Sequence, residues 1–98
     1  MTGLNLFIVS YDIRDQKRLR KVYQTMKEFG TRLHYSVFRC DLNRQGKFEL
    51  IAAISESINH SEDRVMIVDL GPTGGYTEDR ITFLGSEPEE DTRQELIV

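Results

Sequence analysis

The chain has little cysteine and no long hydrophobic run. Its single cysteine, Cys40, excludes an internal disulfide and any zinc site built from several cysteines. No apolar stretch approaches the length of about 20 residues that a membrane-spanning helix needs. The first ten residues also lack the basic start and the small-residue cleavage site of a signal peptide. We therefore expect a cytoplasmic protein without a membrane partner.

An overall positive charge is also missing, since the net charge of the 98 residues is −3. The charges are nevertheless divided unevenly. Residues 1–47 carry ten Lys and Arg against four Asp and Glu, whereas residues 48–98 carry three against twelve. A folded chain of this kind can offer a basic face to phosphates while its remainder stays acidic. The alternative is that the basic residues line one solvated helix.

Apolar patterning predicts alternating strands and helices. The expected elements are a strand over 4–12, a helix over 15–29, two short strands within 31–42, a turn over 43–46, a helix over 47–58, a strand over 63–70 and a short strand over 81–84. One kinked strand over 31–42 is the alternative. Asp15 suits the N-cap of the first helix, and Gly30 suits its end. The buried stripe of the second helix is expected at Leu50, Ile51, Ile54 and Ile58.

This order predicts an α+β fold, a ferredoxin-like βαββαβ domain over residues 1–85 with an extra C-terminal strand. Residues 86–98 form an acidic tail with an apolar end. Two helices cover only one face of such a sheet, yet the strands at 4–9 and 64–70 are apolar on both faces. We expect a homodimer in which a second copy buries the open face and the strand at 81–84 pairs with the partner.

The segment from Tyr11 to Lys21 is the richest in chemistry. Two carboxylates, Asp12 and Asp15, stand three residues apart at a predicted strand-to-helix junction. Magnesium prefers oxygen ligands and usually takes one or two carboxylates together with substrate phosphates. The pattern fits metal-assisted cleavage of a phosphodiester. The simpler interpretation is that Asp15 caps its helix and that Asp12 is a turn residue.

Basic residues follow these carboxylates and could hold the phosphates of a nucleic acid. They are Arg14, Lys17, Arg18, Arg20 and Lys21. At 100° per residue, Arg18 falls on the same side of the helix as Lys17 and Lys21, whereas Arg20 lies on a flank. One Asp12 per chain makes a poor metal site. In a two-fold dimer, two Asp12 carboxylates could share one Mg²⁺ or Mn²⁺.

Other polar residues carry weaker signals. His34 has no carboxylate partner nearby in sequence, and Ser36 lacks the motif of a nucleophilic serine. Tyr35 and Phe38 could stack on bases, although alternating aromatic residues in a strand more often belong to a core or an interface.

Several of these segments together closely resemble the CRISPR-associated protein two family, the small ferredoxin-like subunit of the spacer-acquisition machinery. They are Tyr11-Asp12-Ile13, Asp15, Arg18-Leu19-Arg20-Lys21-Val22, Phe29-Gly30, Tyr35-Ser36-Val37-Phe38 and Asp63-Arg64-Val65. The resemblance implies a homodimer with a metal-dependent nuclease-like site in which Asp12 is the metal-binding aspartate. It also places several residues at positions of nucleic-acid handling or site support, namely Tyr11, Arg18, Arg20, Arg32, Ser36 and Phe38. His34 stands where the family often has Gln.

The function expected first is that of a CRISPR adaptation subunit that binds duplex DNA and the integrase subunit. The alternatives are a Mg²⁺-dependent RNase or DNase, a toxin-type ribonuclease of the virulence-associated family, a non-catalytic scaffold, and a regulatory module for a small ligand. The charge division and Asp12 favour the first two functions over the regulatory module. The run Ser36-Val37-Phe38 favours the CRISPR family over the toxin.

Overall fold

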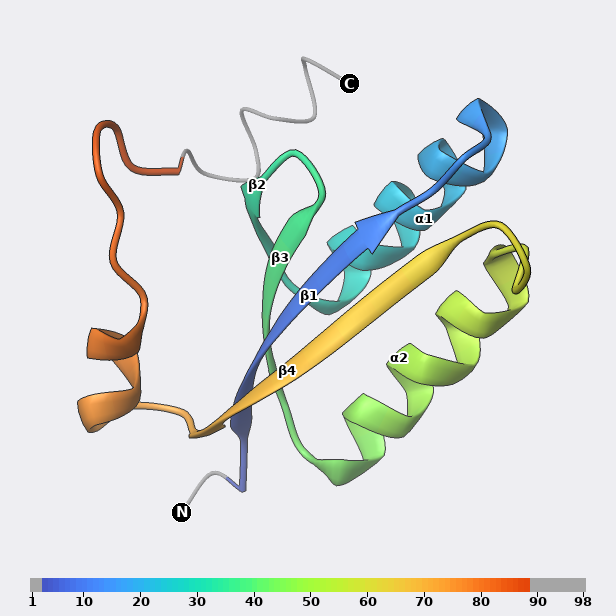
Figure 1. Ribbon diagram of the computed structural model, residues 1–98. Helices are drawn as coiled ribbons and strands as arrows, with labels where there is room; N and C mark the ends of the chain where they lie inside the picture. Colours follow the sequence, from blue (N-terminus) through green and yellow to red (C-terminus); the bar gives the residue numbers. More distant parts are fainter. Residues whose placement is uncertain (1–2, 89–98) are drawn as a thin grey trace.

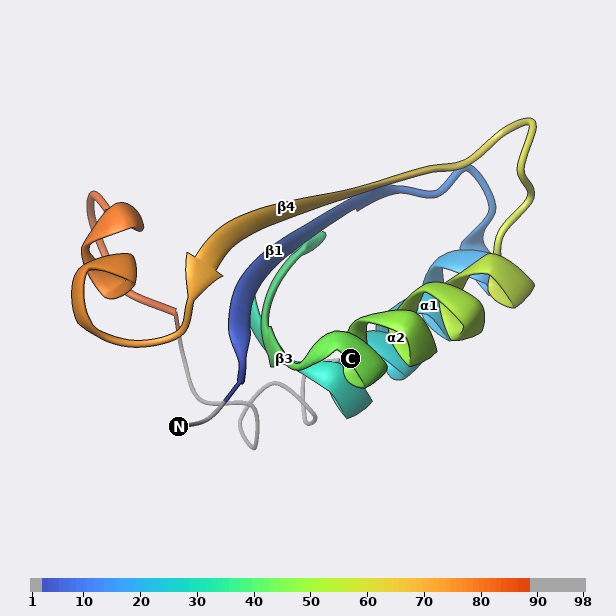
Figure 2. The ribbon, with the colours of Figure 1, turned by 90° about the horizontal axis from the view of Figure 1, so that it is seen from below.

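The computed structural model describes residues 3–88. The elements follow in the order β1 (Asn5–Asp12), α1 (Gln16–Phe29), β2 (Thr31–His34), β3 (Val37–Leu42), α2 (Arg44–Ser57), β4 (Arg64–Pro72) and the 3₁₀ helix η1 (Gly75–Arg80). Both helices lie on one face of the sheet (Figures 1 and 2). The βαββαβ order confirms the α+β ferredoxin-like fold, and residues 31–42 form two strands rather than one.

Strand β1 is central because it is apolar along most of its length. The sheet has the order β2-β3-β1-β4, and β1 runs antiparallel to both of its neighbours. Side chains of a strand alternate between the two faces of its sheet. Phe7, Val9 and Tyr11 are buried under the helices, whereas Ile8 and Asp12 face the other side, called here the free face.

Local signals fix both ends of α1. The carboxylate of Asp15 accepts a hydrogen bond from the backbone N–H of Arg18 at 3.0 Å, which confirms Asp15 as the N-cap. At the other end, the N–H of Gly30 donates to the carbonyl of Met26 at 3.0 Å. A Cβ atom at Gly30 would lie 2.2 Å from the carbonyl oxygen of Arg39, so only glycine allows the chain to pass so close to β3.

Helix α2 begins earlier than the sequence pattern predicts. The side chain of Asn43 accepts a hydrogen bond from the N–H of Gly46 at 2.7 Å and caps a helix that starts at Arg44. The predicted turn over 43–46 is therefore wrong, because an Asn-headed turn and a helix start have the same local composition. Leu50 and Ile54 are buried as predicted, but Ile51 is 42% exposed.

The predicted strand over 81–84 is absent from the single chain. These residues have no regular secondary structure, and η1 precedes them. A strand needs a hydrogen-bonding neighbour, and within residues 3–88 no strand pairs with this segment. The boundary predicted at residue 85 stays a prediction, and most of the acidic tail, residues 89–98, lies outside the described residues.

Neither helix within residues 3–88 is both long enough and apolar enough to cross a membrane.

The core centres on Phe38, which is fully buried between α1 and the sheet. Phe38→Ala is expected to lower the free energy of unfolding by about 3–5 kcal/mol, since it removes packed apolar atoms and leaves a cavity. Phe48, on the outside of α2, is 68% exposed and gives a matched control. Phe48→Ala should change the free energy by less than about 0.5 kcal/mol. Urea denaturation measures both, and equal losses would contradict this location of the core.

Candidate nucleic-acid interface and metal site

The end of β1 carries two predicted site residues on opposite faces. Tyr11 is 5% exposed and points to the helix side, whereas Asp12 is exposed and belongs to the free face. Asp12 pairs in register with Arg64 of β4, so a carboxylate and a guanidinium stand side by side at this edge of the free face. The two predicted site residues are neighbours in sequence but serve different surfaces.

The donors of one chain do not make a metal site by themselves. Within residues 3–88, no group of three or more His, Cys, Asp and Glu side chains is placed to hold a metal ion. Asp15 caps α1, and Asp63 is held in ion pairs, as described below. Asp12 thus offers a single carboxylate, and Mg²⁺ would need a second carboxylate or phosphate oxygens as well.

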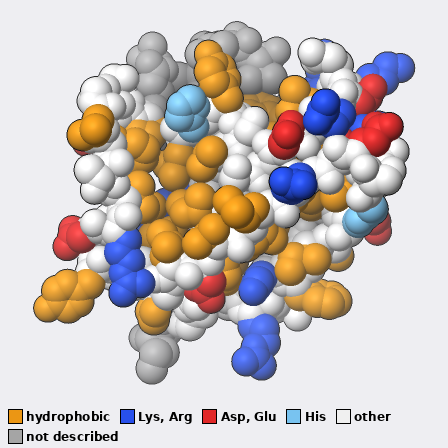
Figure 3. Space-filling model, in the orientation of Figure 1, with side chains coloured by type: hydrophobic (Ala, Val, Ile, Leu, Met, Phe, Trp, Pro, Cys, Tyr) orange, Lys and Arg blue, Asp and Glu red, His pale blue; other side chains and the backbone are white. Residues whose placement is uncertain are grey.

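The free face that carries Asp12 is apolar along its middle. Met66 is 55% exposed and Val68 37% exposed, and hydrophobic side chains gather at the centre of Figure 3. A shallow groove of about 440 Å³ continues the apolar surface, with Ile8, Val37 and Phe83 in its lining. An apolar sheet face of this kind is typical of a surface that another protein covers.

The opposite end of this face is closed by η1. Arg39 of β3 donates to both carboxylate oxygens of Glu78 at 2.8 and 2.6 Å and also pairs with Asp41. The hydroxyl of Thr73 donates to Asp41 at 2.7 Å. These contacts hold η1 against the sheet, and Leu6 on that part of β1 is fully buried.

The basic residues from the end of β1 to the second turn of α1, residues 14–21, separate into two groups. Four are exposed, namely Arg14, Lys17, Arg20 and Lys21, and are called here the basic face. Arg18 differs, because its guanidinium turns toward the loop between α2 and β4. There it donates from Nε to Asp63 at 2.7 Å and from a terminal nitrogen to Glu62 at 3.0 Å. The guanidinium of Arg18 is thus engaged by two carboxylates, and its predicted place beside Lys17 and Lys21 at a nucleic acid stays a prediction.

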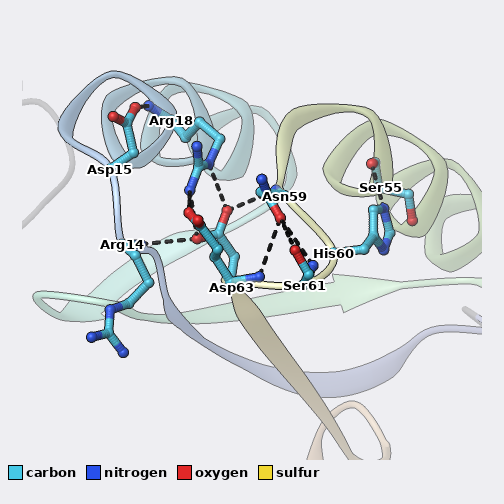
Figure 4. A network of polar contacts seen from close by, with 9 residues as sticks. Arg14, Asp15, Arg18, Ser55, Asn59, His60, Ser61 and Asp63 are labelled. Carbon is cyan, nitrogen blue, oxygen red and sulfur yellow. Dashed lines mark hydrogen bonds and ion pairs between the residues drawn. The ribbon is translucent and has the colours of Figure 1, made fainter.

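Asp63 is the centre of this network (Figure 4). Its side chain is fully buried and accepts hydrogen bonds from the backbone N–H of Arg14 at 2.9 Å and of Asn59 at 2.8 Å, in addition to Arg18. Figure 4 shows the Arg14 side chain pointing away from these contacts. Arg14 can therefore meet a phosphate while its backbone helps to fix Asp63.

The network shifts the titration of both partners. Hydrogen bonds from Arg18 hold the pKa of the Asp63 carboxyl well below its ordinary value, although desolvation by burial opposes the shift. The same bond to Asp63 raises the pKa of the Arg18 guanidinium. Both groups are charged at every physiological pH, so the pair is a fixed connection between the start of α1 and the start of β4.

A pocket of about 300 Å³ opens on the other side of the β1 end. It is lined by Tyr11, Gln16, Leu19, Arg20, Tyr23, Arg32, Tyr35 and Ser36. Four of the predicted site residues meet here, namely Tyr11, Arg32, Ser36 and Arg20, the last of which also belongs to the basic face. The N–H of Tyr11 donates to the carbonyl of Ser36 at 3.0 Å, which ties the strand end to the β2–β3 turn.

Phe38 supports this pocket from below. Its ring stacks against Tyr11 at a centroid distance of 6.3 Å, and being fully buried it cannot touch a bound strand. Burial raises the pKa of the Tyr11 phenol to about 12, with a smaller opposing effect of Arg32. Tyr11 thus stays protonated at neutral pH and keeps a hydrogen-bond donor.

Sequence reasoning gave Asp63 no role of its own, and it treated Tyr23 only as a core residue. Asp63 follows the break between α2 and β4, where nothing in the local pattern announces a partner 45 residues away. Tyr23 lies on the apolar stripe of α1, and only its contact with Arg32 shows that its ring also forms a pocket wall.

Comparison with known proteins adds family relationships to this geometry. A sequence model described as "CRISPR associated protein Cas2" matches residues 5–74. The chain is 44% identical over 94 residues to "CRISPR-associated endoribonuclease Cas2" of Geobacter sulfurreducens, covering 96% of this chain and 98% of that one. It is 34% identical over 92 residues to "CRISPR-associated endoribonuclease Cas2 1" of Rhodospirillum rubrum, covering 94% and 89%.

Solved structures share the fold. A hypothetical protein, TT1823 of Thermus thermophilus, superposes with a TM-score of 0.74 at 28% identity, covering 91% of this chain and all of that one. Streptococcus pyogenes Cas2, crystallised at pH 6.5, gives a TM-score of 0.70 at 24% identity, covering 82% and 99%. The four-stranded sheet and its two helices thus recur in both structures.

The Asp63 network predicts a pH-dependent stability. Because the folded-state pKa of Asp63 is lowered from 3.8, its contribution is complete above that value and is lost as the pH falls below it. Asp63→Asn should lower the thermal midpoint at pH 7 by several degrees. The difference in thermal midpoint between wild type and Asp63→Asn should narrow as the pH falls from about 5 to about 2.

Asp79→Asn, at an exposed aspartate of η1, is the control and should leave the midpoint unchanged. Thermal unfolding followed by circular dichroism across this pH range gives the answer. A gap between wild type and Asp63→Asn that stays constant down to strongly acidic pH would contradict a charge-based contribution of Asp63.

Proposed function

The chain belongs to the CRISPR-associated Cas2 family, and from this premise we propose that it is a homodimeric subunit of CRISPR adaptation. In this proposal the dimer binds duplex DNA and the integrase subunit during spacer acquisition. It also carries a Mg²⁺- or Mn²⁺-dependent endonuclease site at which a phosphodiester is hydrolysed. RNA and DNA are both candidate substrates of that site.

The observation that carries the proposal is the position of Asp12. Its carboxylate lies at the end of a central strand, on the free face, beside the apolar surface formed by Met66 and Val68. A second copy that covers this surface about a two-fold axis near the strand ends would bring its own Asp12 to the same place. The dimer would then hold the two carboxylates that one chain lacks.

The chain's own residues supply binding and orientation. The two Asp12 carboxylates would hold the metal ion, and Arg64, in register with Asp12, would balance their charge or meet a phosphate. A bound Mg²⁺ lowers the pKa of a coordinated water and stabilises the charge that develops on the phosphate. Arg18 acts at a distance, because its pairs with Asp63 fix the β1–α1 junction that carries Asp12.

Duplex DNA is bound in this proposal by the basic face of α1. Contacts to phosphates position a nucleic acid without reading its sequence, as a protein that handles many different spacers requires. The exposed lysines Lys17 and Lys21 are one helical turn apart and face away from the core. We include the integrase subunit as a partner because the family resemblance implies it.

A purely scaffolding function is the second candidate. It is favoured by the finding that, within residues 3–88, no group of three or more His, Cys, Asp and Glu side chains is placed to hold a metal ion. A scaffold would keep the DNA affinity of the basic face and the dimer but would show no cleavage in any metal ion, so cleavage assays on the purified protein separate the two functions.

Binding of duplex DNA should depend steeply on salt. The double variant Lys17→Ala/Lys21→Ala should flatten the slope of log affinity against log salt by about two units, because each lost phosphate contact removes about 0.9. Arg44→Ala, at the exposed start of α2 and at the other end of the helix layer, is the control and should keep the slope (Figure 1). Fluorescence anisotropy at several salt concentrations measures it. An unchanged slope in the double variant would exclude the basic face.

Asp12→Asn should reduce metal-dependent cleavage to the level seen without metal. The dimer should persist, with a mass of about twice 11.4 kDa by light scattering. Asp15→Asn is the matched control, since Asn caps a helix as well as Asp does, and cleavage should continue. Cleavage by Asp12→Asn at the wild-type rate would assign the activity to other residues.

A further inference from the structure

The pocket beside Tyr11 has a composition that neither a metal site nor a duplex contact requires. Its volume of about 300 Å³ lies at the lower end of the range for small-ligand pockets, which suits a ligand the size of one nucleotide. Aromatic rings come from three elements, with Tyr11 on β1, Tyr23 on α1 and Tyr35 in the β2–β3 turn. Such rings form the stacking surfaces on which proteins hold unpaired bases.

Arg32 organises the aromatic wall. The carbon of its guanidinium lies 5.4 Å from the ring centre of Tyr23 and 5.3 Å from that of Tyr35. Its Nε also donates to the carbonyl of His34 at 3.3 Å, and the N–H of Tyr35 donates to the His34 ring nitrogen Nδ1 at 2.9 Å. These contacts place the planar cation beside both rings before any ligand arrives.

Tyr35 is the accessible part of this wall, since 77% of the residue is exposed. A large aromatic side chain at a turn gains little from folding when it stays in water, so its ring is available for stacking. Gln16 and Ser36 add polar groups that can meet the edge of a base, and Arg20 joins the pocket to the basic face.

We propose that this pocket receives a single unpaired nucleotide, with its base stacked on Tyr35 and Arg32 and its phosphate held by Arg20. The ligand chemistry is a flat base joined to a phosphate, which can come from an unpaired position in a longer strand or from a free nucleotide. This pocket adds a ligand site to the proposed function. That the nucleotide comes from a nucleic-acid strand rests on the proposed function.

The position of the pocket relates it to Asp12. Tyr11 lines the pocket and Asp12 is the next residue, with its Cα atom about 3.8 Å further along the strand. Because Tyr11 and Asp12 lie on opposite faces of the sheet, a strand whose base enters the pocket would reach Asp12 where its backbone passes around the end of β1. The pocket would then select the unpaired position at which the phosphodiester reaches the free face.

The test compares two short DNA duplexes that differ only in one unpaired 2-aminopurine on one strand. Binding is measured by anisotropy without divalent metal ions, and the 2-aminopurine fluorescence reports stacking. Wild type should bind the bulged duplex at least about fivefold more tightly, as expected from one base stacked on an aromatic ring, and should quench its fluorescence. Tyr35→Ala should lose both effects.

Two control variants define the contribution of the Tyr35 ring. Tyr35→Phe keeps the stacking surface and should retain the preference for the bulged duplex. Tyr76→Ala removes another tyrosine, 87% exposed in η1 and outside the pocket lining, and should also retain it. The proposed pocket would be overturned if wild type bound both duplexes with equal affinity. It would also be overturned if Tyr35→Ala weakened the binding of both duplexes by the same factor.

A titration with adenosine monophosphate distinguishes a free nucleotide from a nucleotide within a strand. It also distinguishes failure of the proposed duplex binding from failure of the proposed pocket. If adenosine monophosphate quenches the tyrosine fluorescence of wild type but not of Tyr35→Ala, while neither duplex binds, the pocket takes free nucleotides and the duplex-binding function is contradicted. If wild type binds both duplexes tightly and equally, and adenosine monophosphate does not quench its tyrosine fluorescence, the proposed duplex binding is supported and the proposed nucleotide pocket is overturned.

Discussion

The rest of the structure depends on one constraint, which is that successive side chains of β1 alternate between the two faces of the sheet. Strand β1 pairs on both edges and is covered on one face by both helices, so its side chains must alternate between the core and the free face. Val9 and Tyr11 serve the core, and Asp12 follows on the other side. A shift of one residue would bury the carboxylate and expose the phenol, so register alone decides which surface can bind a cation.

The Arg18–Asp63 pair keeps the end of this strand in place. It joins the start of α1 to the start of β4, and the buried Asp63 is saturated by donors from three segments. A buried carboxylate without such donors would be strongly destabilising. Arg18 is thus a structural member of the arginine-rich segment, while Arg14 and Arg20 stay exposed for a ligand. Residue type alone does not distinguish Arg18 from the other two arginines. The difference comes from Asp63, which only folding brings close to Arg18.

Sequence reasoning recovered what local patterns encode. The central strand, the Asp15 cap, the end of α1 at Gly30 and the βαββαβ order all follow from periodicity and capping chemistry. It failed where a local pattern has two solutions, as at Asn43, whose side chain begins a helix instead of a turn. It also did not predict contacts between distant residues, such as the ion pair of Arg18 with Asp63. The strand predicted over 81–84 needs a partner edge that no described strand of the single chain provides.

The central claim is that two chains complete one site, and a mixing experiment tests it most directly. Wild-type and Asp12→Asn chains are unfolded together, refolded at fixed total concentration and assayed for cleavage in Mg²⁺. If each site needs both Asp12 carboxylates, activity falls as the square of the wild-type fraction, to about one quarter in an equal mixture, because only that share of dimers has two wild-type chains. A linear fall, to about one half, would show that each chain acts alone and would contradict the shared site.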